Sequence, residues 1–200
     1  MKLFGIGLSR TGTKSLAEAL SILGFKTGHY DEGMAAIEQT PNGLDINLKA
    51  VAEWDALTDI PAAAFYQELD QAFPGSKFIC TVRDKESWLV SIERHFMTNI
   101  QRYREGHGIC ADKASALREK MYGTTRFDTE VMSKIFDVHY GDVGAYFSGR
   151  EHDLLMLDIC GSATWEPLCS FLEKSVPEVS FPAMNVRSAN FKPSEMEDLS

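Results

Sequence analysis

One stretch near the start of the chain indicates its fold: Gly7-Leu8-Ser9-Arg10-Thr11-Gly12-Thr13-Lys14-Ser15. It joins a predicted strand, residues 2–7, to a predicted helix, residues 13–23. At such a junction the backbone amides and the helix N-terminus form an anion site. The two glycines are spaced as in G-x-x-x-x-G-K-S/T, but Thr13 replaces the lysine and Lys14 follows one residue later. Two cations and several hydroxyls beside these glycines predict a phosphate-binding loop and not an ordinary turn.

Apolar runs alternate with amphipathic stretches along the rest of the chain, which predicts a mostly parallel sheet flanked by helices in three α/β layers. Pro61 is expected in the first turn of its helix. Helical pieces broken at Pro41-Asn42-Gly43 are expected within residues 32–53. The predicted strands are residues 2–7, 25–30, 55–60, 77–82 and 153–159, and the predicted helices are 13–23, 62–73, 84–103, 128–148 and 163–174.

Size and composition predict a single domain over residues 1–200, with 44 % apolar and 24 % charged residues. The net charge of −9 argues against a nucleic-acid binder or a protein bound to anionic membranes. No apolar run approaches the ~18 residues that cross a bilayer, and no signal peptide is evident. The four cysteines show no C-x-x-C spacing, which argues against a zinc or redox site. Because Cys80 and Cys160 lie within apolar runs, we expect them in the core of a cytoplasmic protein.

Two segments are predicted to lie outside the layered core. Residues 104–127 hold three glycines and many charges, so they are expected at the surface, with one short helix, as a candidate lid. The chain from residue 177 onward is expected to be mostly irregular, and residues 186–200 to form a frayed tail.

The loop resembles that of the P-loop sulfotransferases, roughly Lys/Arg-Ser/Thr-Gly-Thr, which binds the 5′-phosphosulfate of 3′-phosphoadenosine 5′-phosphosulfate. The resemblance implies a three-layer P-loop fold and this sulfuryl donor. Many cytosolic members carry an adenine-stacking Trp near the position of Ser15, and this chain lacks it. The donor-binding residues implied in the loop are Arg10, Thr11, Gly12, Thr13, Lys14 and Ser15.

A second match lies at the predicted central strand, where Phe78-Ile79-Cys80-Thr81-Val82-Arg83-Asp84 is followed by Ser91. The family places an Arg at the end of this strand and a Ser eight residues later, and both bind the 3′-phosphate. Ligands of open α/β sheets bind at the carboxyl ends of the strands, which suits Arg83. The alternative is that Arg83 only pairs with Asp84 or Glu86.

A third match is Thr58-Asp59-Ile60-Pro61. Cytosolic sulfotransferases carry Thr-His-Leu-Pro there, with the His as catalytic base, so the resemblance implies that Asp59 takes the acceptor's proton. The alternative is that Asp59 only caps the following helix. His29, at the end of the second predicted strand, is a further candidate for a base or an acceptor contact, beside the alternative of a structural histidine.

The resemblance covers roughly residues 2–185, including Trp165-Glu166-Pro167-Leu168-Cys169 and Phe181-Pro182. It implies in-line transfer of a sulfuryl group to a hydroxyl or amine of a small molecule or carbohydrate, with 3′,5′-ADP as product. Arg10 and Lys14 would neutralise charge on the leaving phosphate, and Asp59 would be the base. No metal is expected, because no two histidines have the spacing of a metal pair on one helix face.

Two other functions fit part of the sequence. Asp158 ends an apolar strand as a Mg²⁺-binding Asp does in a small P-loop nucleotide kinase, although no Arg-rich lid is evident. A non-catalytic module that keeps the fold and binds a partner is the third interpretation, against which the loop cations count. Trp88 is expected to pack in the core or to border the nucleotide.

Overall fold

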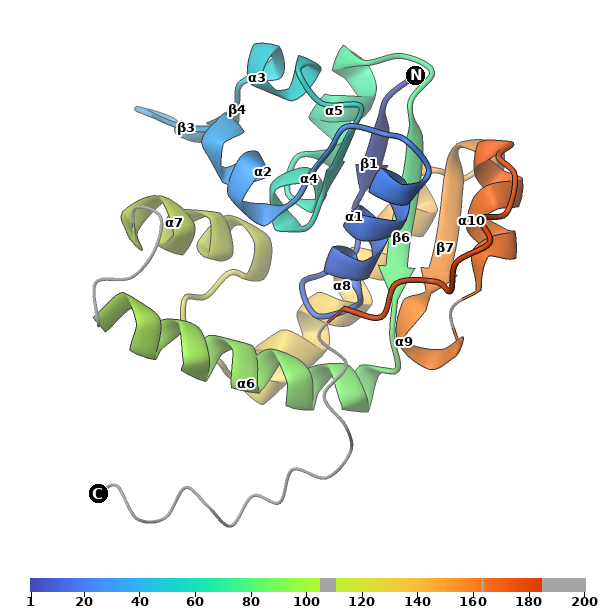
Figure 1. Cartoon of the computed structure of the whole chain (residues 1–200). Coiled ribbons are helices and arrows are strands. Elements are labelled where there is room, and N and C mark those ends of the chain that lie inside the picture. The colour runs from blue at the N-terminus through green and yellow to red at the C-terminus, as the bar shows by residue number, and fades with distance from the viewer. Residues whose placement is uncertain (105–110, 163, 185–200) are drawn as a thin grey trace.

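The computed structural model describes residues 1–104, 111–162 and 164–184, and Figure 1 shows helices surrounding a central sheet. Within these residues the sheet has five parallel strands in the order β2-β5-β1-β6-β7. This confirms the predicted α/β fold with a mostly parallel sheet. The strands are β1 (Leu3–Gly5), β2 (Thr27–Gly28), β5 (Ala56–Thr58), β6 (Lys77–Val82) and β7 (Leu154–Asp158).

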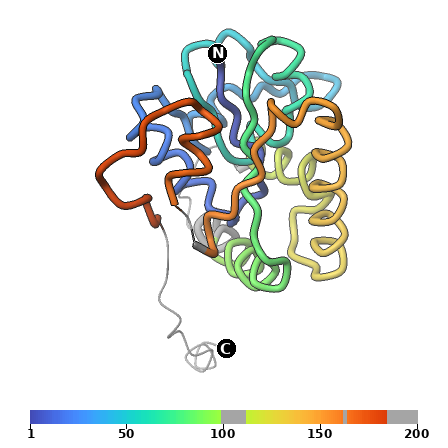
Figure 2. Tube along the Cα trace, turned by 90° about the vertical axis from the view of Figure 1, so that its right-hand side faces the viewer, coloured from blue at the N-terminus to red at the C-terminus, as the bar shows by residue number. Residues whose placement is uncertain are grey.

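Helices cover both faces of the sheet, because neighbouring side chains of each strand point to opposite faces. Leu3 and Ile79 pack with α1 (Thr13–Ile22) and α10 (Trp165–Leu172) on one face. Phe4 and Phe78 pack on the other face, whose helices include α6 (Lys85–Arg104) and α8 (Thr129–Tyr146). Figure 2 shows α1 and α10 on the side of the sheet opposite α8. The second face also carries α4 (Ile60–Ala63) and α5 (Tyr66–Ala72).

The register of the strands brings four loops to one edge of the sheet. Gly5 of β1 lies opposite Thr58 of β5 and Ile79 of β6, and Val82 of β6 lies opposite Asp158 of β7. The residues that follow these strand ends therefore meet at the carboxyl edge, where open α/β sheets bind ligands.

Residues 37–46 form a hairpin that the sequence analysis did not predict. β3 (Ile37–Thr40) and β4 (Gly43–Ile46) pair antiparallel between α2 (Tyr30–Ala36) and α3 (Leu48–Ala52). The expectation of helix pieces alone over residues 32–53 was therefore wrong. The first helical piece ends already at Ala36, and Pro41-Asn42 is instead the turn between β3 and β4, with Ile37 and Ile46 buried opposite each other.

Residues 111–122 are also more buried than predicted. They form α7 (Ala111–Tyr122), and Ala114, Leu117 and Tyr122 belong to the main hydrophobic core. The expected surface segment was therefore wrong for this part, because one face of the helix carries apolar side chains among the charges. Residues 105–110 lie outside the described residues, so the lid remains a prediction, as does the tail at 186–200.

Three shorter expectations need correction. The helix expected at 62–73 is divided into α4 and α5, with Pro61 in the first turn of α4 as predicted. The strand expected at 25–30 is limited to β2. Cys80 is fully buried, and burial raises its pKa to about 12, but Cys160 is exposed. The core placement of Cys160 was wrong because β7 ends at Asp158 and the next residues leave the sheet as α9 (Ile159–Ser162). A short 3₁₀ helix, η1 (Glu151–Asp153), precedes β7.

Candidate functional site

The predicted anion-binding loop runs from β1 to α1 at the carboxyl edge of the sheet. A Cβ on Gly7 would lie 1.9 Å from Oγ1 of Thr81, so only glycine fits beside β6. Gly12 has a φ of 97° and is the N-cap of α1, which has no side-chain cap and no acidic residue in its first turn. The first-turn amides of α1 thus lack an intrahelical or side-chain acceptor and can face an anion.

Ser9 fixes the loop through three contacts with distant parts of the chain. Its backbone N–H donates to the hydroxyl of Tyr122 at 3.3 Å, and its carbonyl accepts from Nε1 of Trp88 at 2.9 Å. Its Oγ donates to Oδ1 of Asp59 at 2.7 Å. These bonds join α7, α6 and the segment after β5 to the loop, so one residue sets the position of three walls of the site.

The two loop cations lie beside the same group of amides. Nε of half-buried Arg10 donates to Oγ of Ser91 on α6 at 3.2 Å, and Arg10 itself has a φ of 74°. Lys14 is exposed in the first turn of α1, and the described residues offer it no hydrogen bond or ion pair. Lys14 is therefore available to an anion that binds the loop.

Arg83 and Ser91 meet around Arg10 and do not bond to each other directly. Nη1 of Arg83 donates to the carbonyl of Arg10 at 3.1 Å, and Nε donates to Oγ of Ser87 at 2.9 Å. The alternative pairing with Asp84 or Glu86 is not what these bonds show. Ser87 was not predicted; it lies in the first turn of α6, four residues after Arg83, which precedes the helix.

The loop hydroxyls have different surroundings. The Thr11 hydroxyl is fully buried; it donates to the carbonyl of Leu8 at 2.6 Å and lies 2.6 Å from the hydroxyl of Thr81. It holds the loop together, so Thr11 could contact a ligand only through its backbone. Thr13 is nearly buried at the start of α1, and Oγ of Ser15 accepts the backbone N–H of Met184 at 2.9 Å.

Asp59 caps α4, as the alternative interpretation predicted, and its carboxylate also faces His29; its role as a base stays a prediction. Oδ1 accepts the backbone N–H of Ile60 at 2.8 Å, and Oδ2 lies 3.4 Å from Nε2 of His29. Asp59 has a φ of 77° and a ψ of −172°, a conformation that non-glycine residues adopt at a cost of ~1–3 kcal/mol. Such strain is found where the surrounding contacts hold a functional side chain in place.

His95 is a site residue that the sequence analysis missed. Burial lowers its pKa to about 4; Asp59 raises it, whereas Arg10 and Arg118 lower it further. His95 is therefore neutral at pH 7. It follows Ser91 by one helical turn, and this spacing is the signal that would have placed it on the same face of α6. Arg118 is a second missed residue, buried on α7.

Comparison with known proteins decides the family. A family model described as Sulfotransferase domain matches residues 2–190. The chain belongs to the sulfotransferase domain family. It is also similar to Ava biosynthesis cluster protein M of Aspergillus versicolor. The alignment is 225 residues long with 28 % identity, and it covers 96 % of this chain and 84 % of that protein. The resemblance inferred from the loop and from Arg83 is thereby confirmed.

Asp158, the residue that favoured a kinase, has a structural role in this sulfotransferase-family chain. Oδ1 of Asp158 accepts the backbone N–H groups of Cys160 at 3.0 Å and of Gly161 at 2.9 Å. Asp158 therefore caps α9, a role that accounts for a carboxylate at the end of β7. Trp88 is fully buried and its ring nitrogen binds the loop, so it packs behind the loop.

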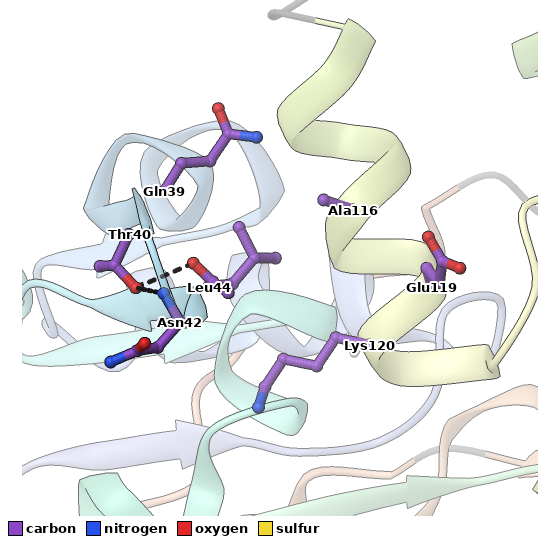
Figure 3. A pocket seen from close by; sticks show the side chains of 8 residues that line it. Gln39, Thr40, Asn42, Leu44, Ala116, Glu119 and Lys120 are labelled. Atoms are coloured by element: carbon purple, nitrogen blue, oxygen red, sulfur yellow. Dashed lines mark hydrogen bonds between the residues drawn. The ribbon is translucent and has the colours of Figure 1, made fainter.

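A surface pocket of about 420 Å³ lies between the β3–β4 hairpin and α7, as Figure 3 shows. Glu119 and Lys120 of α7 line it together with Gln39 and Thr40 of the hairpin. Lys120 is two residues from Arg118, which is about 200° around a helix. The pocket thus opens on the face of α7 opposite the site, and it is not part of the site at the carboxyl edge of the sheet.

Over residues 1–104, 111–162 and 164–184, no three His, Cys, Asp or Glu side chains form a group that could hold a metal ion. Over the same residues, no helix is both long and apolar enough to cross a membrane. Independence from metal stays a prediction.

Proposed function

We propose that the protein transfers a sulfuryl group from 3′-phosphoadenosine 5′-phosphosulfate to a hydroxyl or amine, with release of 3′,5′-ADP. The observation that carries this proposal is the meeting of the Arg10–Lys14 loop, Arg83 and Asp59 at one edge of the sheet. The loop and Arg83 supply positive charge for an anionic donor, and Asp59 supplies a proton acceptor beside them.

The residues present fit a donor that carries anions at both ends of its ribose. The uncapped first turn of α1, with Arg10 and Lys14, suits the 5′-phosphosulfate. Arg83, with the hydroxyls of Ser87 and Ser91 nearby, suits the 3′-phosphate, because a guanidinium gives charge-assisted and bidentate bonds to phosphate. A 5′-nucleotide without the 3′-phosphate would leave this second group without a ligand.

Positioning and charge stabilisation are the contributions of this chain's residues to the transfer. When bound, the donor supplies the sulfuryl group. Arg10 and Lys14 stabilise the charge that grows on the leaving phosphate, and the amides of α1 hold it in place. Asp59 accepts the proton of the attacking hydroxyl or amine. A sulfuryl group carries less charge than a phosphoryl group, so these two cations suffice in this proposal without a metal.

The acceptor we propose is a small molecule or a carbohydrate. The related Aspergillus versicolor protein is named for a biosynthesis cluster, and this name supports a small-molecule acceptor over a macromolecular one. The net charge of −9 also makes a nucleic-acid acceptor unfavourable.

Calorimetry with nucleotides and EDTA tests the donor. We expect 3′,5′-ADP to bind roughly 10- to 100-fold more tightly than 5′-AMP, since a hydrogen bond to a charged group contributes ~1.5–3 kcal/mol. Arg83→Ala should remove this preference, whereas Lys49→Ala, at an exposed position of α3, which lies far from the end of β6 in Figure 1, should keep it.

Two results would contradict the proposal. Equal affinity of the wild type for 3′,5′-ADP and 5′-AMP would remove the 3′-phosphate site. Mg²⁺-dependent consumption of ATP would favour a nucleotide kinase instead, because P-loop kinases need the metal to bridge the phosphates.

A further inference from the structure

The two oxygens of the Asp59 carboxylate have different surroundings. Oδ1 accepts two hydrogen bonds, from Oγ of Ser9 at 2.7 Å and from the backbone N–H of Ile60 at 2.8 Å. Oδ2 lies 3.4 Å from Nε2 of His29. Oδ1 therefore fixes the carboxylate in place, and Oδ2 is the oxygen that can receive a proton.

The ring of His29 is anchored on its other side. Nδ1 lies 2.8 Å from Oγ1 of Thr58, and the Thr58 hydroxyl has its own acceptor in the carbonyl of Gly28 at 3.5 Å. If the Thr58 proton points to Gly28, Oγ1 accepts the N–H of Nδ1. This tautomer, which the inference requires, leaves the lone pair of Nε2 facing Asp59. The backbone N–H of His29 bonds to Oε2 of Glu32 at 3.0 Å and holds the residue.

A lone pair facing a carboxylate oxygen creates a place for one additional proton. An ordinary Asp side chain titrates near ~4 and an ordinary His near ~6.5, so an aspartate alone is a weak base at neutral pH. An imidazole behind the carboxylate gives the proton a more basic site. His95, which also interacts with Asp59, cannot take this role, because its pKa is lowered to about 4.

We propose that His29 is the final proton acceptor of the reaction and that Asp59 passes the proton to it; this rests on the proposed sulfuryl transfer. The acceptor oxygen or nitrogen forms a bond to sulfur, and the bond from sulfur to the 5′-phosphate oxygen breaks. The electron pair of that bond stays on 3′,5′-ADP. The acceptor's proton moves to Oδ2 of Asp59 and then to Nε2 of His29, whose side chain is 25 % exposed and returns the proton to solvent.

The tautomer of His29 gives a direct test that needs no acceptor. In a long-range ¹H–¹⁵N spectrum of the whole chain, with His29→Gln to assign the signal, we expect the proton on Nδ1. Thr58→Ser keeps the hydroxyl and should keep this tautomer, whereas the isosteric Thr58→Val should move the proton to Nε2. A wild-type ring with its proton on Nε2 would overturn the proposal.

Kinetics then test the role in transfer, with water as the acceptor and sulfate release from 3′-phosphoadenosine 5′-phosphosulfate as the signal. His29→Gln should slow this release by roughly 10²-fold or more, the lower range for general-base catalysis, with unchanged affinity for 3′,5′-ADP. Thr27→Val serves as a control, since it removes a nearby hydroxyl that bonds only to the carbonyl of Phe25 among the described residues.

The outcomes separate this inference from the proposed function. A wild-type rate in His29→Gln, together with a slow Asp59→Asn, would show that Asp59 acts alone and would overturn the inference only. A wild type that binds no 3′,5′-ADP and releases no sulfate would overturn the proposed function, and the inference with it.

Discussion

The contact between the β1–α1 loop and α9 can be tested with two glycines at opposite ends of α1. Gly12 and Gly24 both have positive φ, 97° and 89°. A Cβ on Gly12 would lie 2.8 Å from Cβ of Ile159, whereas a Cβ on Gly24 would meet nothing within 4 Å. Alanine at either position carries the backbone cost of ~1–2 kcal/mol. Only Gly12→Ala adds the cost of overpacking, about 1–3 kcal/mol.

Thermal unfolding of the two variants measures this difference. In a chain of this size ~1 kcal/mol changes the Tm by about 2–4 °C, so Gly24→Ala should lower it by roughly 2–8 °C. Gly12→Ala should lower it by about 2–12 °C more, and it should also weaken 3′,5′-ADP binding, which Gly24→Ala should leave unchanged. Equal losses of Tm in the two variants, with equal nucleotide affinity, would refute the packing of Ile159 against the loop.

Three further predictions concern single side chains. The pKa of His95 lies near 4 in the fold and near ~6.5 when unfolded, so its contribution to stability is present above pH 6.5 and is lost as the pH falls towards 4. Between pH 7 and pH 5, the free energy of unfolding in urea should fall by about 1–2 kcal/mol less for His95→Gln than for the wild type. Equal losses in the two proteins would contradict the shift. Trp88→Phe leaves the buried carbonyl of Ser9 without its donor and should cost about 1–3 kcal/mol in the same assay, so wild-type stability would argue against this bond. Lys14→Ala should reduce sulfate release more than it reduces 3′,5′-ADP affinity, if Lys14 acts on charge that develops in the transition state; an unchanged rate would show that it is only a solvated cation.

Elements with strong local signals were predicted nearly to the residue. The apolar run of β6 was placed at residues 77–82 as observed, and α6 was expected from 84 to about 103 and is found at Lys85–Arg104. Elements whose stability comes from contacts with distant segments were not predicted. The β3–β4 hairpin is an example, because its pairing and the burial of Ile37 depend on the helices around it.

The sequence by itself determined the family, the parallel sheet and the placement of Arg10, Lys14, Asp59 and Arg83 at its carboxyl edge. The sheet and its edge follow from local patterns, namely glycine spacing, apolar periodicity and the rule that parallel strands end together. The family follows from the resemblance of the loop and of the Arg83 strand to those of known sulfotransferases. None of these predictions requires knowledge of which distant side chains touch.

Only the tertiary structure decided how these groups are held. The bonds that fix Ser9 span 79 residues to Trp88 and 113 residues to Tyr122, and no local pattern encodes such pairs. The same holds for His29, which reaches Asp59 only because β2 pairs with β5. Contacts between adjacent strands depend on the order of strands in the sheet, and this order is set by packing of the whole core.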